Sequence, residues 1–425
     1  MPAHVLIIPS EEFLPPESHL AGIFQLHQAN ALVAAGFRVG VISLRLALSV
    51  PMIFRSGFYR LAGRSPGNSL DGRSIPELAT LLKRKMMDPE SFITFDQVGT
   101  IPVVRAEAFY FFPPSPSTDH IGWIRSGVAA FKAYCERFGR PDVIHAHNLN
   151  PAGLLAQRLS KESEIPYLVT EHSTFYARGL VPQALFGRLR QAAVEADTIA
   201  AVSPQLGKLV EDQLKLDASH IRWVPNVIDP LVVTAPKATR PSAPAGFEFL
   251  CVGNLIPIKN HAVLLHAFHD AFKGDSRVTL RIGGDGPLEA ELKALSSQLG
   301  VEKQVEFLGR LSREQVIEEL DKCDALVLPS SIETFGVVLI EALVRGKPVV
   351  ATRCGGPEAF IGEDDGLVVA ADDKLELSLA LSMMRDRAAS YDPARLRSSA
   401  LARFGPEALV ENLTQLYDNA IAANV

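Results

Sequence analysis

The sequence has little cysteine, no long apolar run and no strong charge of either sign. Its four cysteines stand far apart and form no Cys-x-x-Cys pair, which argues against a disulfide framework or a cysteine zinc site and fits a reducing, cytoplasmic setting. No uncharged apolar run reaches about 18 residues, so we expect no transmembrane helix. The formal net charge is -6, and nothing in the overall composition argues for nucleic acid as a partner.

The N-terminal residues lack the basic region of a secretory signal peptide, and their short apolar stretch predicts a first buried strand instead. The loop after this strand carries no Gly-x-Gly-x-x-Gly fingerprint, which counts against a nicotinamide-dependent enzyme. What the chain does have is length and apolar content. Its 425 residues are more than a domain with a single hydrophobic core usually contains. Hydrophobic residues make up 47% of the chain, which supplies enough apolar surface for two domains or more.

The fold class follows from an alternation of short apolar runs with segments of helical period. This alternation is typical of βαβ units and of parallel sheets that are covered on both faces, and it occurs twice. The first set of predicted strands is 4–8, 38–43, 103–110, 142–145, 167–170, 198–202 and 221–224. The second set is 247–252, 278–282, 305–308, 325–328, 349–351 and 367–369. We therefore expect an α/β protein with two Rossmann-like domains.

A proline-rich stretch at 229–246 separates the two sets. Its prolines are expected to interrupt any regular element, so we place the domain boundary there. The expected domains are 1–228 and 229–405, with a last helix at 406–425 that crosses back onto the first domain. In the second domain, leucines at 288, 292, 295 and 299 followed by Gly300 predict a helix with a glycine stop. Residues 45–100 are less regular and contain a basic cluster at 83–85. An insertion of this kind usually carries specificity or a moving lid.

The most informative segment is 329–343, where a predicted strand ends and an apolar helix begins. In such a strand-loop-helix unit the free backbone N–H groups face the carboxyl edge of the sheet and form an anion site. A diphosphate would accept hydrogen bonds there from the amides of Thr334, Phe335, Gly336 and Val337. The helix dipole adds about 0.3 to 1 kcal/mol.

Glu341 is a carboxylate in a helix that is apolar nearly all round, where an unpaired charge is costly to bury. Two interpretations stay open from the residues alone. Glu341 pairs with Arg345, Lys347 or another buried base, or it accepts hydrogen bonds from the two hydroxyls of a ribose. In the second case Glu333, just before the helix, faces the other end of a nucleotide diphosphate; otherwise Glu333 is a solvated loop residue.

Together these motifs resemble the retaining nucleotide-sugar glycosyltransferases of family 4, which have the GT-B fold. Glu333 and Glu341 match the Glu-x7-Glu pair of that family. The other matching segments occur in the family's order and cover nearly all of the second domain: 252–259 (VGNLIPIK), 282–287 (IGGDGP), 305–309 (VEFLG), 329–330 (PS), 346–350 (GKPVV) and 355–358 (GGPE). The resemblance implies two Rossmann-like domains whose parallel sheets face a central cleft.

The resemblance also implies roles for residues of the donor site. Lys259 corresponds to the lysine that neutralises the donor diphosphate, where charge grows on the leaving phosphate. Gly253 and Asn254 belong to the same donor loop, and Asn254 stands where the family often has arginine, so Lys259 or another base must supply more charge. The backbone at Arg310 and Leu311 is expected to hold the edge of the nucleotide base.

The first domain matches the family more loosely. Gly22 corresponds to the glycine loop that lets backbone approach the donor phosphate. His145 and His147 lie two residues apart at a strand end, which makes a metal pair conceivable, but no third ligand stands at a matching spacing. The resemblance selects His147 as the residue near the donor sugar, with His145 as a packing histidine. Glu171 and His172, at the next strand end, are expected to line the acceptor side.

The expected function is transfer of a sugar from a nucleotide diphosphate sugar to an acceptor hydroxyl, with retention of configuration, in glycan or glycolipid synthesis. The resemblance implies no metal or other cofactor, and the chain has no Asp-x-Asp motif. Expected partners are the nucleotide-sugar donor and a glycan or lipid-linked acceptor, with no nucleic acid. The basic cluster at 83–85 either contacts such an acceptor or the inner face of a membrane, or is a solvated helix face. A nucleotide-sugar epimerase and a non-catalytic sugar-nucleotide binding protein are the alternatives.

Overall fold

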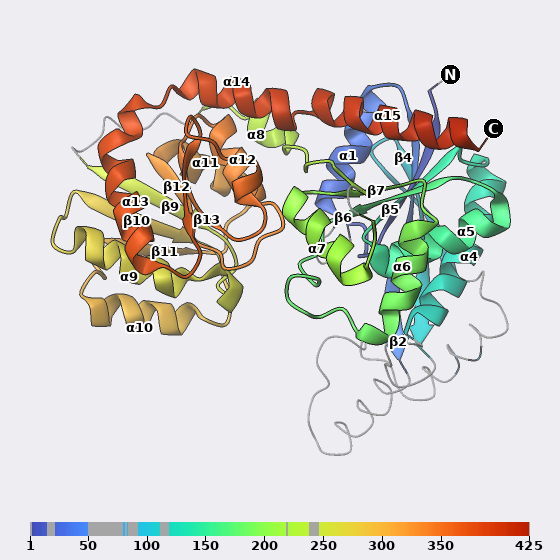
Figure 1. Cartoon of the computed structure of the whole chain (residues 1–425), viewed down its shortest axis with the longest axis horizontal. Coiled ribbons are helices and arrows are strands. Elements are labelled where there is room, and N and C mark those ends of the chain that lie inside the picture. Colours follow the sequence, from blue (N-terminus) through green and yellow to red (C-terminus); the bar gives the residue numbers. More distant parts are fainter. Residues whose placement is uncertain are drawn as a thin grey trace, which may run out of the picture. The chain divides into compact units, whose positions relative to one another are not determined.

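The computed structural model describes residues 2–14, 22–49, 92–110, 119–217, 220–237 and 246–424, together with residues 80 and 83 (Figure 1). The chain divides into two compact units. The first contains Met1–Ala201, Gly207–Arg222 and Val410–Val425, and the second contains Val202–Leu206 and Trp223–Leu409. The division falls shortly before the expected boundary, and each unit has its own sheet.

The first unit is built on an eight-stranded sheet in the order β3-β4-β2-β1-β5-β6-β7-β8. Its strands are β1 (His4–Pro9), β2 (Arg38–Ser49), β3 (Ile93–Val98), β4 (Ile101–Tyr110), β5 (Val143–His147), β6 (Tyr167–Glu171), β7 (Thr198–Ala201) and β8 (Ile221–Trp223). All residues of β1, β5 and β6 are buried, as expected for central strands covered on both faces. All seven predicted strands of this half are confirmed.

One strand of the first sheet differs from the prediction. β3 is an additional edge strand, and it pairs antiparallel with β4, so the first sheet is mixed rather than purely parallel. The two strands are joined by a tight hairpin at Gly99, whose φ of 59° suits a turn. The middle residues of β3 are exposed, which removes the apolar signal that made the buried strands recognisable.

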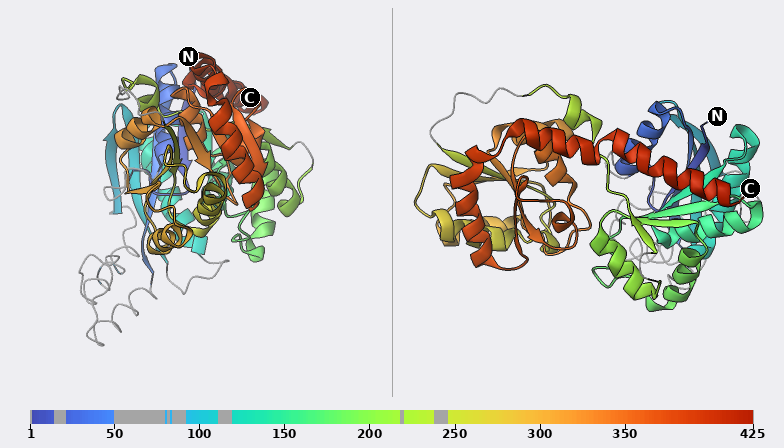
Figure 2. Two further views of the ribbon diagram at one scale, coloured as in Figure 1. Left: turned by 90° about the vertical axis from the view of Figure 1, so that its left-hand side faces the viewer. Right: turned by 45° about the horizontal axis from the view of Figure 1, so that its top comes forward.

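The helices of the first unit connect these strands. They are α1 (Ile23–Ala34), α4 (Asp119–Phe138), α5 (Leu154–Ser163), α6 (Phe186–Val194), α7 (Pro204–Leu214) and the later part of α15 (Pro406–Ala423). The last of these comes from the far end of the chain and packs on the same unit, as the two views of Figure 2 show. Leu413, Tyr417 and Ala420 of α15 are buried, and Asn424 donates a hydrogen bond to Asp197.

The second unit is built on a six-stranded sheet in the order β11-β10-β9-β12-β13-β14, in which all pairs are parallel. Its strands are β9 (Phe247–Val252), β10 (Val278–Gly283), β11 (Val305–Gly309), β12 (Ala325–Leu328), β13 (Val349–Arg353) and β14 (Gly366–Ala370). All six predicted strands are confirmed. The order reverses between β9 and β12, and ligands of open α/β sheets bind at such a switch point, outside the carboxyl ends of the strands.

The helices of the second unit are α8 (Pro230–Thr234), α9 (His261–Phe272), α10 (Glu289–Leu299), α11 (Arg313–Lys322), α12 (Val337–Val344), α13 (Lys374–Arg387) and α14 (Pro393–Phe404). The predicted helix with the glycine stop is α10, which Gly300 ends with a φ of 71°. The stretch at 229–246 was expected to hold no regular element, and this is wrong at its start. Asp229 caps α8, because a proline is tolerated in the first turn of a helix, where Pro230 stands.

Several predictions fall partly outside the described residues. Most of the insertion at 45–100 is not described, and of the basic cluster only Lys83 is. The loop before Gly22 is likewise outside the described ranges. Within the part of the chain that is described, no helix is both long and apolar enough to cross a membrane.

Candidate active site

The sequence predicts an anion site at the loop between β12 and α12 in the second unit. Gly336 is the N-cap of α12, with a φ of 93° that glycine adopts readily. A Cβ added there would lie 2.8 Å from Leu339 Cδ1 and 3.1 Å from Leu328 Cδ2, so the position is also closed sterically. The first amides of a helix generally lack acceptors within it, which is why an anion is expected at this end of α12. The amide of Leu339 is already engaged, since it donates to the Gly336 carbonyl at 2.9 Å.

Lys259 and Glu333 meet at this loop. Lys259 Nζ lies 2.5 Å from Glu333 Oε2, and the two side chains are 22% and 13% exposed. Glu333 is held by its backbone, since its N–H donates to the carbonyl of Cys354 at 3.0 Å. Gly253 lies beside the lysine stem, where an added Cβ would contact Lys259 Cδ at 3.7 Å. The structure thus brings three predicted donor residues from two segments of the chain into one place.

The remaining predicted donor residues differ in how far their side chains are exposed. Phe335 is buried in an aromatic cluster with Phe360 and Phe404, at ring-centroid distances of 4.9 and 5.7 Å, so its side chain belongs to the core. Asn254 is exposed, and its carbonyl accepts a hydrogen bond from the N–H of Ile256 at 2.9 Å. Thr334 and Val337 are partly exposed beside Gly336.

Arg310 and Leu311 follow β11 at the carboxyl end of the sheet. Arg310 is exposed, whereas the Leu311 side chain is partly buried and lies against the backbone of β10: an added Cβ on Gly283 would stand 2.5 Å from Leu311 Cδ1. A residue larger than glycine at 283 would displace this leucine and with it the turn that was expected to hold the nucleotide base.

Glu341 is buried, with 3% of its side chain exposed, and it pairs with Arg313. Arg313 Nη2 donates to Oε1 at 2.6 Å, and Nη1 approaches Oε2 at 3.5 Å. The two bases that the sequence suggested are engaged elsewhere. Arg345 binds Asp321 and the carbonyls of the α8 segment, and Lys347 donates to two backbone carbonyls.

The Arg313 guanidinium also binds Asp229, through Nε at 3.0 Å and Nη2 at 2.8 Å. Sequence reasoning found neither residue. One signal was present: Ser312 and Gln315 form a capping box, which places Arg313 at the first position of α11. A cation there is unfavourable toward the helix dipole unless an acidic partner compensates it.

In the first unit, His147 and Glu171 end the neighbouring parallel strands β5 and β6. His147 Nδ1 lies 2.9 Å from His172 Nε2, and the two rings stack at 5.0 Å. His147 is 1% exposed, and its Nε2 atom has no hydrogen-bond partner among the described residues. Burial lowers the pKa of His147 well below its usual value, so the ring is neutral near pH 7.

His145, two residues earlier, is fully engaged. Its Nε2 lies 2.7 Å from the hydroxyl of Thr170, and its Nδ1 lies 2.7 Å from Tyr417 and 3.0 Å from the Gln28 amide. Burial lowers its pKa to about 3. This is the hydrogen-bonding pattern of a packing histidine, whereas His147 keeps one ring atom unsatisfied. Among the described residues, no group of three His, Cys, Asp or Glu side chains is placed so that it could hold a metal ion.

Glu171 is completely buried, and its carboxylate accepts hydrogen bonds from the amides of Leu149 at 3.0 Å and Ser173 at 2.9 Å. Burial raises its pKa to about 7, although these amides act in the opposite direction. Glu171 therefore orders the loops around the two strand ends, and its neighbour His172 is the more exposed of the two. Gly22, the N-cap of α1, donates its N–H to Glu11 at 3.1 Å.

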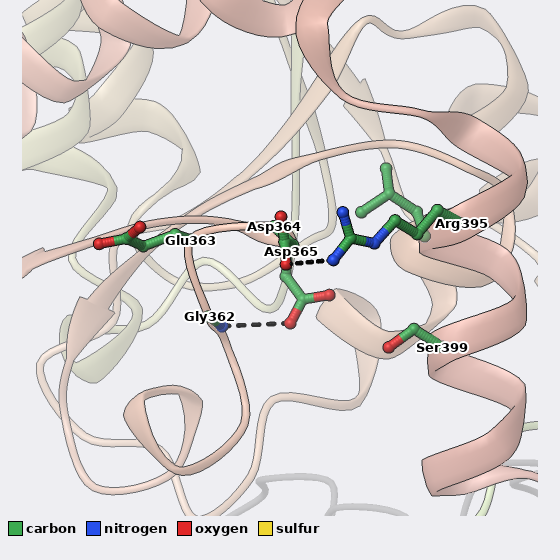
Figure 3. Close-up of a pocket in the computed structure, with 7 residues that line it drawn as sticks. Gly362, Glu363, Asp364, Asp365, Arg395 and Ser399 are labelled. Atoms are coloured by element: carbon green, nitrogen blue, oxygen red, sulfur yellow. Dashed lines mark hydrogen bonds and ion pairs between the residues drawn. The ribbon is translucent and has the colours of Figure 1, made fainter.

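A small pocket elsewhere in the second unit shares no residue with the predicted site (Figure 3). It lies between the loop 362–365 and helix α14. Arg395 pairs with Asp364 at 2.6 Å, and Asp365 accepts the N–H of Gly362 at 3.1 Å. Asp365 also pairs with Arg403 at 3.0 Å, so both aspartates of this pocket are engaged.

Comparison with known proteins identifies the family. A model described as "Glycosyl transferases group 1" matches residues 238–389, and one described as "Glycosyltransferase Family 4" matches residues 72–230. The glycogen synthase of Mycobacterium tuberculosis is 30% identical over 283 residues, which make up 64% of this chain and 67% of that protein. The chain belongs to the family 4 glycosyltransferases. Another relative of this glycosyltransferase is the lipopolysaccharide core biosynthesis glycosyltransferase LpsD of Rhizobium meliloti, 28% identical over 66% of this chain and 76% of LpsD.

Solved structures agree on the fold. The sucrose-phosphate synthase of Thermosynechococcus elongatus superposes with a TM-score of 0.69 at 20% identity, covering 99% of this chain and 100% of that one. The Anabaena protein HepE in complex with UDP superposes with a TM-score of 0.67 at 18% identity, covering 98% and 99%. The glycosyltransferase therefore has the GT-B fold, as the sequence motifs predicted.

Proposed function

We propose that this glycosyltransferase moves a sugar from a nucleotide diphosphate sugar to an acceptor hydroxyl in glycan or glycolipid synthesis. The observation that carries the proposal is the contact between Lys259 and Glu333 at the amino end of α12. A cation, a carboxylate and free helix amides at one strand end are the groups that a sugar diphosphate needs. HepE has been solved with UDP and with UDP-glucose, which supports a donor of this class.

In the proposed complex the diphosphate lies against the amides of Thr334 to Val337, and Lys259 turns from Glu333 to the phosphates. Glu333, released from the lysine, binds hydroxyls of the sugar. Glu341 accepts the two ribose hydroxyls, and the backbone of Arg310 and Leu311 holds the base edge. Gly253 and Asn254 line the loop that carries Lys259.

We propose that the reaction proceeds with retention of configuration. The bond between the anomeric carbon and the phosphate oxygen breaks while the acceptor oxygen attacks the same face of the sugar. The acceptor proton passes to an oxygen of the leaving diphosphate. The charge that grows on this diphosphate is met by Lys259 and the helix amides, so the chemistry proceeds without a metal ion.

The first unit contributes His147 and the acceptor side. In the proposal, His147 Nε2, which has no partner in the described part of the protein, makes a hydrogen bond with a hydroxyl of the donor sugar. His172 fixes the orientation of this ring through His147 Nδ1. Glu171 orders the loops at the two strand ends, where a glycan or lipid-linked acceptor approaches.

A panel of labelled nucleotide sugars tests this function. Release of nucleoside diphosphate is measured with and without glycan and lipid-linked acceptors, on the wild type and on Lys259→Ala. We expect release that depends on acceptor and on Lys259. Conversion of a donor to an isomer without acceptor would indicate an epimerase, and binding without turnover for every donor would indicate a binding protein.

A further inference from the structure

Arg313 joins two buried carboxylates that come from different helices. Asp229 caps α8, Glu341 lies in the middle of α12, and Arg313 is the first residue of α11. The guanidinium lies 2.6 Å from Glu341 Oε1 and 2.8 Å from Asp229 Oδ2. The side chains of Glu341 and Asp229 are 3% and 9% exposed, so Arg313 meets the charge of two carboxylates that are largely removed from solvent. Asp229 also accepts a hydrogen bond from the N–H of Leu231 at 2.9 Å.

The geometry leaves acceptor capacity on Glu341. An ionised carboxylate offers about four lone-pair positions on its two oxygens. Arg313 occupies one position on Oε1 with a short bond and approaches Oε2 only at 3.5 Å. Two hydroxyls of one ribose can therefore bind Glu341 while the arginine stays in place.

The electrostatic balance makes Arg313 important for the charge of Glu341. Burial raises the pKa of Glu341, the nearby Asp229 acts in the same direction, and Arg313 acts against both. The charged groups around the arginine are Asp229, Glu341 and the exposed Glu314. Without the guanidinium, two buried carboxylates would face each other, and protonation of Glu341 would relieve the repulsion. A protonated Glu341 has fewer acceptor positions for a ribose.

We infer that Arg313 is a positioning residue for the donor nucleotide: it keeps Glu341 a carboxylate and fixes the direction of both oxygens toward the ribose hydroxyls. This inference rests on the proposed function, because it assigns the ribose to Glu341. It adds a residue from α11 to the site, and this residue also contacts Asp229.

Calorimetric binding of UDP, ADP and GDP and of their 2′-deoxy counterparts tests the inference. For the base that binds best, we expect the wild type to prefer the ribose form by about tenfold, the value of one good hydrogen bond to a charged group. Arg313→Gln should lose about tenfold in affinity for the ribose form, and its preference should shrink toward that of Glu341→Gln. Its affinity should also fall more steeply than that of the wild type as the pH is lowered, because Glu341 without the arginine takes up a proton more readily.

Two further variants separate charge from geometry. Arg313→Lys keeps the positive charge without the planar fork, so it should keep the pH profile of the wild type and lose part of the ribose preference. Asp229→Asn leaves the contact between Arg313 and Glu341 and should keep the preference. The matched control is Arg385→Gln, because Arg385 likewise pairs with two carboxylates, those of Asp386 and Asp275, and lies on α13 of the same unit, which carries none of the predicted donor residues.

The outcomes are distinct. A folded Arg313→Gln protein that keeps the wild-type ribose preference and pH profile would show a purely structural ion pair and overturn the inference, while the proposed function would stand. The inference would also be overturned if Arg313→Gln does not fold and Arg313→Lys keeps both the full ribose preference and the wild-type pH dependence of affinity. The proposed function would again stand. A wild type that binds none of the three diphosphates would overturn the proposed function and the inference together.

Discussion

At the scale of single residues, Lys259 and Glu333 form an ion pair that the proposed donor would open. Both side chains are only partly exposed, so each charge has lost part of its hydration. Their contact at 2.5 Å offsets this cost for both residues. A sugar diphosphate offers each residue a replacement, phosphate oxygens for the lysine and hydroxyl groups for the glutamate. The exchange leaves no charge unpaired, which suits a site that binds and releases an anion repeatedly.

This exchange predicts different kinetics for the two residues. Lys259→Ala should lower kcat by about 100-fold or more, because the lysine meets charge that grows only in the transition state. Glu333→Gln should also lower kcat, but the KM for the donor should stay the same or fall, because the freed lysine is then available to the diphosphate. Both constants are measured from diphosphate release.

The matched control for these variants is Lys293→Ala, since Lys293 is an exposed lysine that pairs with Glu289 on α10 of the same unit. It should keep wild-type kinetics. Wild-type turnover in Lys259→Ala would contradict the phosphate role.

The buried titratable groups of the first unit predict opposite effects of pH on stability. The pKa of His145 is lowered to about 3 and that of His147 is also lowered, so their stabilisation is complete above their unfolded pKa and is lost as the pH falls. The pKa of Glu171 is raised to about 7, so its contribution falls as the pH rises toward 7. Each group changes the unfolding free energy by about 1.4 kcal/mol per pH unit where its two states differ fully in protonation.

Between about pH 5 and about pH 6 the combined effect of the two histidines on the unfolding free energy should therefore exceed the opposite effect of the glutamate. The first unit should then become more stable as the pH rises. His147→Asn should flatten this slope and Glu171→Gln should steepen it. The measurement is denaturant unfolding in a Trp223→Phe background. In that background Trp123, buried in the first unit, is the single fluorescent tryptophan, because the sequence has two. Slopes that change in the same direction in both variants would contradict the assignment.

At the scale of elements, the turn into α12 is the feature on which the donor site depends. Gly336 combines a left-handed backbone with a contact that leaves no room for a Cβ. Gly336→Ala should destabilise the protein by about 1 to 3 kcal/mol through backbone strain and displace the amides that face the diphosphate. We expect a raised KM for the donor together with a lower unfolding free energy.

A second glycine serves as the control that distinguishes backbone strain at Gly336 from the general effect of replacing glycine by alanine. Gly187 lies in helix α6, and an added Cβ there would have nothing within 4 Å. Gly187→Ala should be neutral or stabilise by about 0.4 to 1 kcal/mol, because alanine restricts the unfolded chain. Unchanged donor KM in Gly336→Ala would show that the backbone of this turn does not hold the phosphate.

The helices and strands differ in how well the sequence predicts them. The buried strands and α10 follow from apolar patterns and a glycine stop, which are local signals. The edge strand β3 was missed because its exposed residues carry no such pattern, and α8 was missed because a proline was taken as an interruption rather than a start. The partner of Glu341 was missed for another reason: Arg313 lies on a different helix, and no local pattern records which helices pack together.

At the scale of the whole molecule, an acidic chain binds an anionic donor. The formal charge of -6 gives no general attraction for a diphosphate. The main cation of the proposed phosphate site is itself paired with Glu333, so the attraction must come from oriented amides and from the exchange of partners by Lys259. The folded positions of a few dipoles, rather than the net charge, account for donor binding.

The chain returns to its first unit at the end, since Val410–Val425 belong to that unit. Tyr417 of α15 reaches the ring of His145 at 2.7 Å, next to the proposed catalytic histidine. The C-terminal helix thereby supports the strand end that carries His147.

The most direct test of the central claim is the anomeric configuration of the product, read by NMR after reaction with the preferred donor and acceptor in the presence of excess EDTA. The account predicts a product with the configuration of the donor, formed at the same rate as without EDTA, and little product from Lys259→Ala. An inverted product, or a reaction that stops when metal ions are removed, would contradict it.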